Sequence, residues 1–242
     1  MHKAMNSLKS VYLAMQIKAA SLTTMKVLVI GATGQSGLLI ISEALARGYE
    51  VIALVRCPEK INIMHEKLKV VQVDILKSEE IAENLKGCDA VLSAIGGRPG
   101  IMTPCDIYSK SGEAVVKAMR ETGVKRFIAI TAWGTKDDPD LPFVWKWVLK
   151  PSFLRNIVKD MEIFEDYLLK ECSDINYTVV KPPRLTNEPS NGEKIIAKEG
   201  QCIANVSNAI SRQDVVRFML DNITSQDYFK KLVSVAMSSE KK

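Results

Sequence analysis

The chain has 242 residues, of which 47% are apolar and 25% charged, and its formal net charge is +5. This length suits one α/β domain with a substantial core, and this composition is that of an ordinary globular protein. No apolar run reaches the ~18 residues that a membrane-spanning helix needs. A charge this small argues against nucleic acid as a partner. We therefore expect a small-molecule partner, with neither membrane nor nucleic acid involved.

The five cysteines are scattered, and none are in C-x-x-C spacing. An odd number in a chain of this length favours a reducing compartment over a disulfide scaffold. The only histidines are His2 and His65, so a histidine-based metal site is not expected. We predict a monomer in the cytoplasm, without a metal.

Residues 1–24 differ from the rest, because they contain lysines but no acidic residue, the first of which is Glu43. A transit-like amphipathic segment is one interpretation, but such segments favour arginine, which is absent here. The preferred interpretation is a poorly ordered leader before a domain that spans 25–242.

From Met25 onward, short apolar segments alternate with helical patterns. Strands are predicted over 26–30, 50–55, 68–73, 90–93, 126–131 and 176–181, and helices over 36–47, 78–85, 106–121 and 159–170. Gly48 and Gly123 stand where helices commonly end in a left-handed residue. Buried strands separated by helices predict a doubly wound parallel sheet of the Rossmann type, in a single α/β domain.

The first strand runs directly into a glycine-punctuated turn, Gly31-Ala-Thr-Gly-Gln-Ser-Gly37. Gly31 permits a sharp turn, Gly34 permits close approach of a phosphate, and Gly37 permits tight packing of helix on strand. The helix that follows offers unpaired N–H groups to an anion. These features predict a dinucleotide site that includes Thr33, Gln35 and Ser36. The alternative is an ordinary glycine-rich turn.

The end of the second strand predicts which nucleotide binds. An NAD-selective site usually carries an acidic residue there, whereas this strand ends in Arg56, with Lys60 one turn later. A guanidinium binds a 2′-phosphate through paired charge-assisted hydrogen bonds. We therefore predict NADP(H) as the cofactor, with a solvated surface charge as the alternative role of Arg56.

Two further strand ends are candidate cofactor contacts. Asp74, after the third strand, is placed either to accept a hydrogen bond from the adenine amino group or to cap the next helix. The fourth strand ends in Ser93-Ala-Ile-Gly-Gly-Arg98. The small residues there allow close approach to the adenosine ribose and diphosphate, and a plain glycine loop is the alternative. The predicted contacts of this segment are Ala94, Ile95 and Gly96.

After Lys181 the regular alternation ends. We expect a small substrate-side region over 182–236, with a hairpin over 194–204 and a helix through 215–220. Ser211 and Asp214 have the pattern of a helix N-terminal cap. The segment 232–236 is predicted as a final edge strand.

Together these segments resemble the atypical short-chain dehydrogenase/reductases, in particular the NmrA-like branch and the biliverdin reductase B (flavin reductase) type. The resemblance covers about 25–236 and rests on the glycine motif, Tyr49 to Arg56, Val73-Asp74-Ile, Ser93 to Gly97 and Lys181-Pro-Pro-Arg184. It implies a single-domain NADPH-dependent reductase that acts on flavins or open-chain tetrapyrroles. Within the same resemblance, Thr131 lies beside the nicotinamide, and Lys181 and Pro182 are cofactor contacts.

The chain departs from ordinary short-chain dehydrogenases at their acid–base residues. Their Tyr-x-x-x-Lys pair lies on a helix, whereas the one match here, Tyr177 and Lys181, lies in a predicted strand. Ala132 occupies the expected position of their serine, and Tyr167 falls about two turns late. Reduction of an isolated carbonyl needs an acid, but a flavin delocalises the incoming charge. We therefore expect a conjugated acceptor.

The remaining candidates concern the acceptor. Arg98 and Arg184 are predicted substrate contacts, and for Arg184 a plain loop charge is equally compatible. Five aromatic residues cluster between Thr131 and the next predicted helix: Trp133, Phe143, Trp145, Trp147 and Phe153. They form either a wall over a flat acceptor or part of the core, which is the preferred interpretation for Trp147 and Phe153, and Trp133 is the predicted substrate contact. The rival functions are an NmrA-like protein that senses NADP(H) without turnover, and an enzyme acting on alcohols, ketones or sugar nucleotides.

Overall fold

We describe a computed structural model of the chain, which covers residues 24–97, 104–141, 143, 154–190 and 192–238. Residues 1–23 of the predicted leader, and Arg98, Trp145, Trp147 and Phe153, lie outside the described residues.

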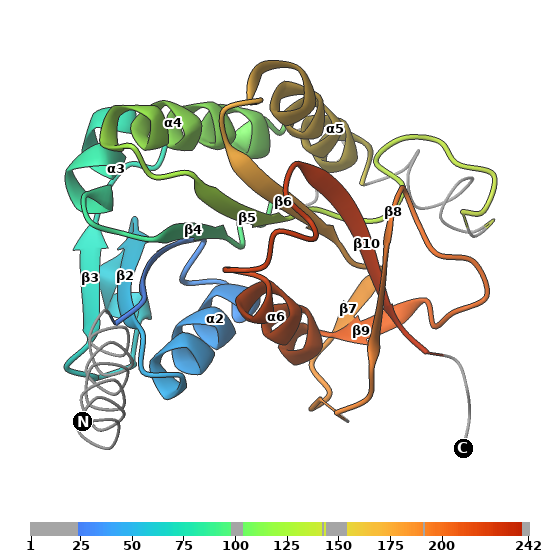
Figure 1. The fold of residues 1–242 in the computed structure, drawn as a ribbon, viewed down its shortest axis with the longest axis horizontal. Helices are drawn as coiled ribbons and strands as arrows, with labels where there is room; N and C mark the ends of the chain where they lie inside the picture. The colour runs from blue at the N-terminus through green and yellow to red at the C-terminus, as the bar shows by residue number, and fades with distance from the viewer. Residues whose placement is uncertain (1–23, 98–103, 142, 144–153, 191, 239–242) are drawn as a thin grey trace, which may run out of the picture.

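The central feature is a sheet of eight strands in the order β3-β2-β1-β4-β5-β6-β10-β8 (Figure 1). Neighbouring strands run parallel except β10 and β8, which are antiparallel. The order of the first six is the strand order of dinucleotide-binding folds. In chain order the strands are β1 Lys26–Ile30, β2 Glu50–Val55, β3 Leu68–Gln72, β4 Ala90–Ser93, β5 Arg126–Ile130, β6 Asn176–Lys181, β8 Ile195–Glu199 and β10 Lys231–Met237.

Helices cover both faces of this sheet (Figure 1). On one face, α2 (Gln35–Ala46) packs against α6 (Arg212–Asp221). On the other face, α4 (Ile107–Thr122) lies between α3 (Ser78–Leu85) and α5 (Arg155–Glu171). A short 3-10 turn, η1, spans Pro58–Lys60, and a small parallel sheet pairs β7 (Arg184–Thr186) with β9 (Ala209–Ser211).

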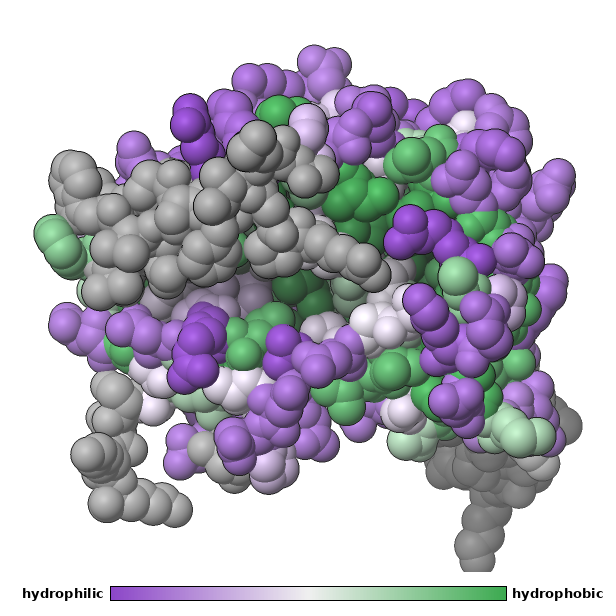
Figure 2. Space-filling model, turned by 180° about the vertical axis from the view of Figure 1, so that it is seen from behind, coloured by the Kyte–Doolittle hydropathy of each residue, from purple (hydrophilic) through white to green (hydrophobic). Residues whose placement is uncertain are grey.

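The core has two layers because successive side chains of a strand point to opposite faces. In β1, Leu28 and Ile30 belong to the layer under α3, α4 and α5, whereas Val27 and Val29 belong to the layer under α2 and α6. All four are fully buried. Because both faces of β1 are covered, its residues form a continuous apolar run. The face opposite to that of Figure 1 is largely hydrophilic, with apolar residues visible in a hollow (Figure 2).

The predicted α/β fold is confirmed, and its first six strands agree with the structure to within one residue at each end. Gly48 and Gly123 adopt the left-handed conformation, with φ of 81° and 79°. The predicted cap at Ser211 is also confirmed, because its Oγ accepts a hydrogen bond from the Asp214 backbone N–H at 2.9 Å. The helix α5 begins at Arg155, four residues earlier than predicted.

Two predictions for the C-terminal part are wrong. There is no hairpin over 194–204: β8 pairs instead with β10, antiparallel, across the intervening β9 and α6. The strand predicted at 232–236 is not an edge strand, because β10 lies between β6 and β8 and the edge is β8. Within 182–236, only β7 and β9 form a separate sheet, while β8, β10 and α6 belong to the main layers.

Among the described residues, we find no helix that is both long and apolar enough to cross a membrane.

Candidate functional site

The turn after β1 consists of glycines because backbone atoms crowd around it. Gly31 has a φ of +73°, and a Cβ there would lie 2.5 Å from the carbonyl carbon of Ala94. A Cβ at Gly37 would lie 2.2 Å from the carbonyl oxygen of Gly31. The Gly34 N–H closes the turn by donating to the Gly31 carbonyl at 3.0 Å. The turn therefore packs directly against the end of β4, and α2 packs directly against the turn.

The N-terminus of α2 is left open by its sequence. Gly34 is the N-cap and provides no side-chain hydrogen bond, and the first turn holds no acidic residue. The first N–H groups of a helix have no partner within the helix, and the helix dipole makes this end positive. The start of α2 is thus suited to an anion such as a phosphate group.

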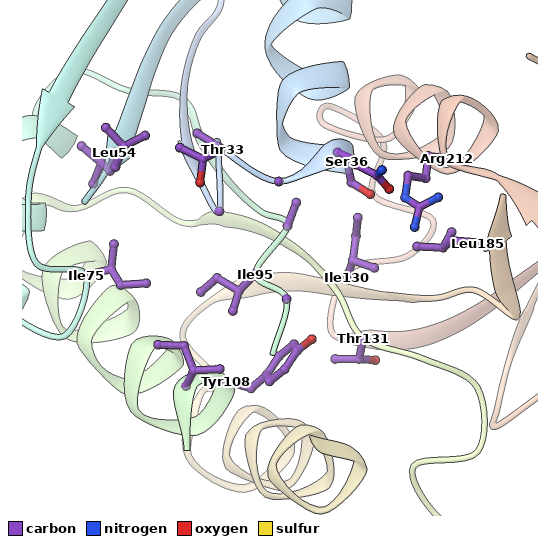
Figure 3. Close-up of a pocket in the computed structure, with 18 of the residues that line it drawn as sticks. Thr33, Ser36, Leu54, Ile75, Ile95, Tyr108, Ile130, Thr131, Leu185 and Arg212 are labelled. Carbon is purple, nitrogen blue, oxygen red and sulfur yellow. The ribbon is translucent and has the colours of Figure 1, made fainter. Parts of the chain in front are cut away.

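A cavity of about 420 Å³ lies at this end of α2 (Figure 3). Such a volume is within the usual range for a small-molecule site. Most predicted cofactor contacts line it: Gly31, Thr33, Gly34, Gln35, Ser36, Arg56, Ala94, Ile95, Gly96 and Thr131. Gly37 lies beneath the turn and acts through packing.

The cavity extends across several strand ends. Leu54 and Arg56 come from the end of β2, Ala94 follows β4, and Thr131 follows β5. In the sheet, β1 and β4 separate β2 from β5. Three spacings between neighbouring strands amount to about 14 Å, so the cavity accommodates an extended ligand. It lies where the strand order reverses around β1, which is where open α/β sheets bind ligands.

Arg56 lies at one end of this cavity. Its side chain is exposed, and Val55 and Ile75 lie nearby in the cavity wall. The Gln72 side-chain amide donates to the Arg56 carbonyl at 3.2 Å. Among the described residues, no carboxylate forms an ion pair with its guanidinium, so the charge is available to an anionic ligand.

Lys60 and Asp74 do not line the cavity. Lys60 is exposed at the end of η1. The Asp74 carboxylate accepts a hydrogen bond from the Leu76 N–H at 3.0 Å, while the N-cap of α3 is Lys77. Asp74 therefore shapes the turn before α3 and is not its N-cap, and its predicted contact with adenine stays a prediction.

Thr131 is buried in the cavity wall and is tied to a charged pair behind it. Its Oγ1 donates to Glu165 Oε1 at 2.7 Å. Lys181 Nζ donates to both oxygens of Glu165, at 3.0 and 2.8 Å. The side chains of Lys181 and Glu165 are only 0% and 1% exposed. A hydroxyl has one hydrogen, and that of Thr131 is directed to Glu165, away from any ligand.

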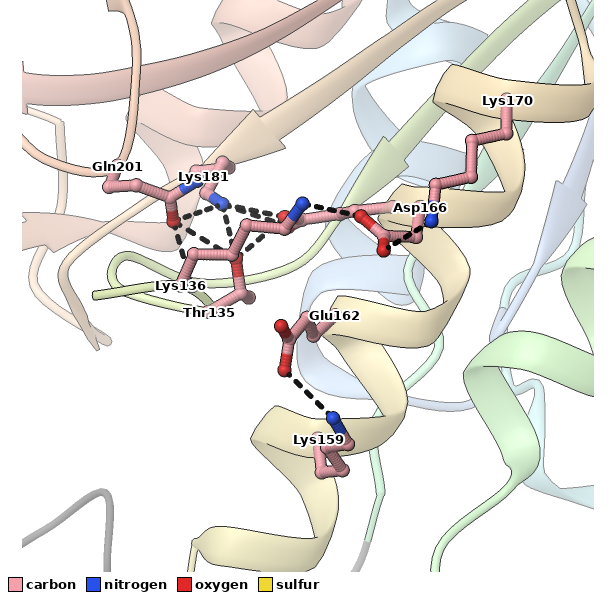
Figure 4. Close-up of polar contacts among 9 residues, drawn as sticks. Thr135, Lys136, Lys159, Glu162, Asp166, Lys170, Lys181 and Gln201 are labelled. Carbon is pink, nitrogen blue, oxygen red and sulfur yellow. Dashed lines mark hydrogen bonds and ion pairs between the residues drawn. The ribbon is translucent and has the colours of Figure 1, made fainter. Parts of the chain in front are cut away.

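Lys181 therefore lies behind the cavity wall. Its ammonium also donates to Thr135 Oγ1 at 2.6 Å and to Gln201 Oε1 at 2.9 Å (Figure 4). A buried ion pair is stable only when its remaining hydrogen bonds are satisfied. Here the carboxylate of Glu165 also accepts a hydrogen bond from Thr135 at 2.6 Å. These hydrogen bonds give Lys181 a structural role. Its side chain does not line the cavity, so its predicted contact with the cofactor stays a prediction.

The predicted acceptor contacts are not brought together. Trp133 is 4% exposed and packs in a separate cluster with Leu141 and Cys202, and its backbone N–H donates to the Pro182 carbonyl at 3.0 Å. Arg184 is exposed at the start of β7. Neither Trp133, Pro182 nor Arg184 lines the cavity, and Phe143 is 72% exposed.

Several cavity residues were not predicted from the sequence, among them three on helices where no local motif marks them. Tyr108 comes from the first turn of α4, Met161 from the middle of α5 and Arg212 from the start of α6. Burial raises the pKa of Tyr108 above its ordinary value, so its phenol stays neutral at physiological pH. Burial lowers the pKa of Arg212, which nevertheless remains charged.

The acid–base pair of ordinary short-chain dehydrogenases has no counterpart on α5. Met161 lines the cavity, and Glu165 follows four residues later, one helical turn away. Tyr177 and Lys181 lie in β6, which confirms that their spacing is that of a strand. Tyr167 does not line the cavity.

Comparison with known proteins agrees with a dinucleotide site in this cavity. Residues 31–226 match the model of a protein family described as NAD(P)H-binding. An uncharacterized chloroplastic protein of Arabidopsis thaliana is 28% identical, over 99% of this chain and 86% of its own length. A Bacillus subtilis protein described as an uncharacterized sugar epimerase, YhfK, is also 28% identical, over 84% of this chain and 90% of its own.

Among solved structures, a Streptococcus pneumoniae protein provisionally described as an NADH-flavin reductase superposes with a TM-score of 0.69. It is 25% identical, and the alignment covers 88% of this chain and 100% of that one. The family match confirms a nicotinamide dinucleotide, NAD(P)H, as the cofactor, in agreement with the predicted NADP(H).

Proposed function

This chain belongs to the NAD(P)H-binding family, and from that premise we propose that it is an NADPH-dependent reductase acting on a flavin or a similarly conjugated acceptor, tetrapyrroles included. The resemblance of the sequence to the NmrA-like branch and to the biliverdin reductase B type supports this proposal.

The residues of the cavity suit the cofactor. The glycine turn leaves no room for side chains, and the open N-terminus of α2 suits the diphosphate. Arg56, with no carboxylate nearby in the cavity wall, suits a 2′-phosphate, which favours NADPH over NADH. When bound, the cofactor supplies a hydride. The chain's own part is to bind and orient the reactants and to exclude water.

One observation carries the choice of acceptor: the described residues that line the cavity include no lysine that could form a tyrosine–lysine acid–base pair. Met161 is apolar, the hydroxyl hydrogen of Thr131 is directed to Glu165, and Tyr108 has a pKa raised by burial, with no lysine in the cavity wall to lower it. Carbonyl reduction needs an acid near the developing charge, whereas a conjugated ring delocalises that charge. Ile130 and Met161 add an apolar wall suited to a flat ring.

The test is anaerobic NADPH oxidation with FMN, riboflavin or biliverdin as acceptor, followed by NADPH absorbance. We expect one NADPH consumed per acceptor reduced, with NADPH preferred to NADH. A simple ketone and a simple aldehyde serve as controls, and we expect neither to be reduced. Reduction of these and not of the flavins would contradict the proposal.

The missing acid–base pair also favours a second function, an NADP(H)-sensing protein that regulates a partner without turnover. Tight binding of NADPH without consumption across flavins, tetrapyrroles and quinones would support this alternative. The cytoplasmic location and the monomeric state stay predictions, and the Arabidopsis relative is described as chloroplastic.

A further inference from the structure

Arg212 is a second positive charge in the cavity, and it belongs to an element far from the glycine motif in sequence. It is the first residue of α6, and its half-buried side chain lines the cavity wall. Ser36, in the first turn of α2, lines the same cavity, and Figure 3 draws the two side chains next to each other in the view shown. The helices α2 and α6 pack against each other, which fixes this approach.

The charge of Arg212 has no counter-ion among the described residues. Its Nη1 donates to a neutral acceptor, Asn187 Oδ1, at 2.6 Å. Other arginines pair with carboxylates: Arg120 with Asp174 at 2.8 Å, and Arg217 on the same helix with Asp214 at 3.0 Å. Desolvation lowers the pKa of Arg212, with no neighbouring carboxylate to offset it. A half-buried cation of this kind favours binding of an anion.

Arg126 provides a contrast, because it is also buried and, among the described residues, also has no carboxylate as an ion-pair partner. Its guanidinium donates to the backbone carbonyls of Asn176, Asn222 and Ile223, and it lies over the Phe229 ring. These contacts fill its donors within the core. Within the part of the chain that the structure describes, Arg212 makes one side-chain hydrogen bond, to Asn187, and its side chain lines the cavity.

The position of Arg212 indicates which anion it meets. In the strand order β2-β1-β4-β5, the turn after β1, which leads into α2, lies between the end of β2, with Leu54 and Arg56, and the end of β5, with Ile130 and Thr131. A nucleotide whose 2′-phosphate meets Arg56 has its diphosphate bridge at the start of α2. Ser36 lies there, and Arg212 faces it (Figure 3).

We propose that Arg212 binds the diphosphate bridge of the cofactor and holds it against the N-terminus of α2. This inference rests on the proposed cofactor site. The two arginines then have separate roles: Arg56 distinguishes NADPH from NADH, and Arg212 binds the part common to both. Asn187 is a positioning residue that directs the guanidinium. Because Asn187 follows β7, whose Leu185 lines the cavity, the contact also joins the small sheet to the cofactor.

The experiment measures binding directly, by calorimetry, for NADPH, NADH and 2′-AMP, which carries the 2′-phosphate but no diphosphate. We expect Arg212→Ala to weaken NADPH and NADH by the same factor, about 10- to 100-fold, the usual effect of a charged hydrogen bond. Binding of 2′-AMP is unchanged. Arg217→Ala is the matched control, because it removes the same charge from the same helix outside the cavity, and it leaves all three affinities unchanged.

Other outcomes would overturn the proposal. Loss of NADPH affinity alone would assign Arg212 to the 2′-phosphate, and an unchanged Kd with a raised KM for FMN would assign it to the acceptor. Should Arg212→Ala fold poorly, Arg212→Gln retains part of the side chain and a polar amide while removing the charge, and we expect the same equal loss. None of these affinities depends on turnover, so failure of flavin reduction leaves this test intact.

Discussion

The carbonyl oxygen of Gly31 lies 2.2 Å from the place that a Cβ at Gly37 would occupy. We therefore expect Gly37→Ala to push α2 away from the turn, at a cost of about 1–3 kcal/mol, as overpacking usually does. In a domain of this size, that corresponds to a melting temperature lower by roughly 2–12 °C, measured by circular dichroism.

Gly96 is the control for that substitution. It also lies in the cavity wall, but a Cβ there meets no atom of the described residues within 4 Å. We expect Gly96→Ala to preserve the melting temperature. Equal destabilisation by both variants would show that steric crowding at Gly37 is not the cause.

Arg56→Ala should weaken NADPH about 10- to 100-fold, because it removes a charged partner of the 2′-phosphate. The NADH affinity should change by less than about threefold, since NADH lacks that phosphate. Fluorescence titration gives both values. Lys60→Ala is the matched control, because Lys60 is the next cation along the chain and lies outside the cavity wall. Equal losses for both nucleotides in Arg56→Ala would contradict the assignment.

Substitutions of Thr131 test whether its hydroxyl has a structural or a catalytic role. Thr131→Val keeps the shape of the side chain but removes the hydrogen bond to Glu165, so we expect stability to fall by about 1–3 kcal/mol. The kcat for flavin reduction should stay within about threefold, because that hydroxyl is not directed to the ligand. Thr131→Ser retains the hydroxyl and should retain most of the stability. A hundredfold loss of kcat in Thr131→Val with unchanged stability would instead show that the hydroxyl takes part in the chemistry.

Tyr108 is the strongest remaining candidate for a proton donor, since its side chain lines the cavity. Its raised pKa makes it a weaker acid than an exposed tyrosine. We expect Tyr108→Phe to reduce flavin at a rate within about threefold of the wild type between pH 6 and pH 8. A large loss, together with a changed pH profile, would identify Tyr108 as the acid.

The pair Arg120–Asp174 gives a pH-dependent test of stability. Arg120 donates to both oxygens of Asp174, at 3.0 and 2.8 Å, and lowers the pKa of that carboxyl from 3.8 to about 2. A lowered pKa adds stability above the ordinary pKa, and this stability is lost as the pH falls through about 2. Both side chains are 41% exposed, so solvent screening limits the contribution to about 1 kcal/mol or less. In urea unfolding, Asp174→Asn should be less stable than wild type at pH 7, and the difference should shrink towards pH 2.

The sequence predicts the first six strands because each is a short apolar run between helical patterns, and local periodicity is enough to find it. The pairing of β8 with β10 is different, because α6 and β9 lie between the two strands in sequence. Turn residues such as Gly200 suggest a local hairpin, and only packing of the whole sheet selects the distant partner.

The same distinction applies to the site. Contacts within one motif, such as Gly31 to Ser36, follow from the sequence, whereas Tyr108 and Arg212 enter through the arrangement of α4 and α6. The position of Lys181 shows the limit of strand-end reasoning: its partner Glu165 comes from α5, and nothing in the pattern of β6 signals the pair.

The interior place of β10 has a consequence for how the chain is made. It is the last described strand in sequence, yet it separates β6 from β8 in the sheet. A ribosome therefore releases β6 and β8 before the strand that joins them exists. Until then β6 presents an unpaired edge, the kind of surface that recruits other chains. During synthesis at high temperature or high expression, nascent chains should therefore aggregate through this edge, and a chaperone that shields extended segments should raise the yield.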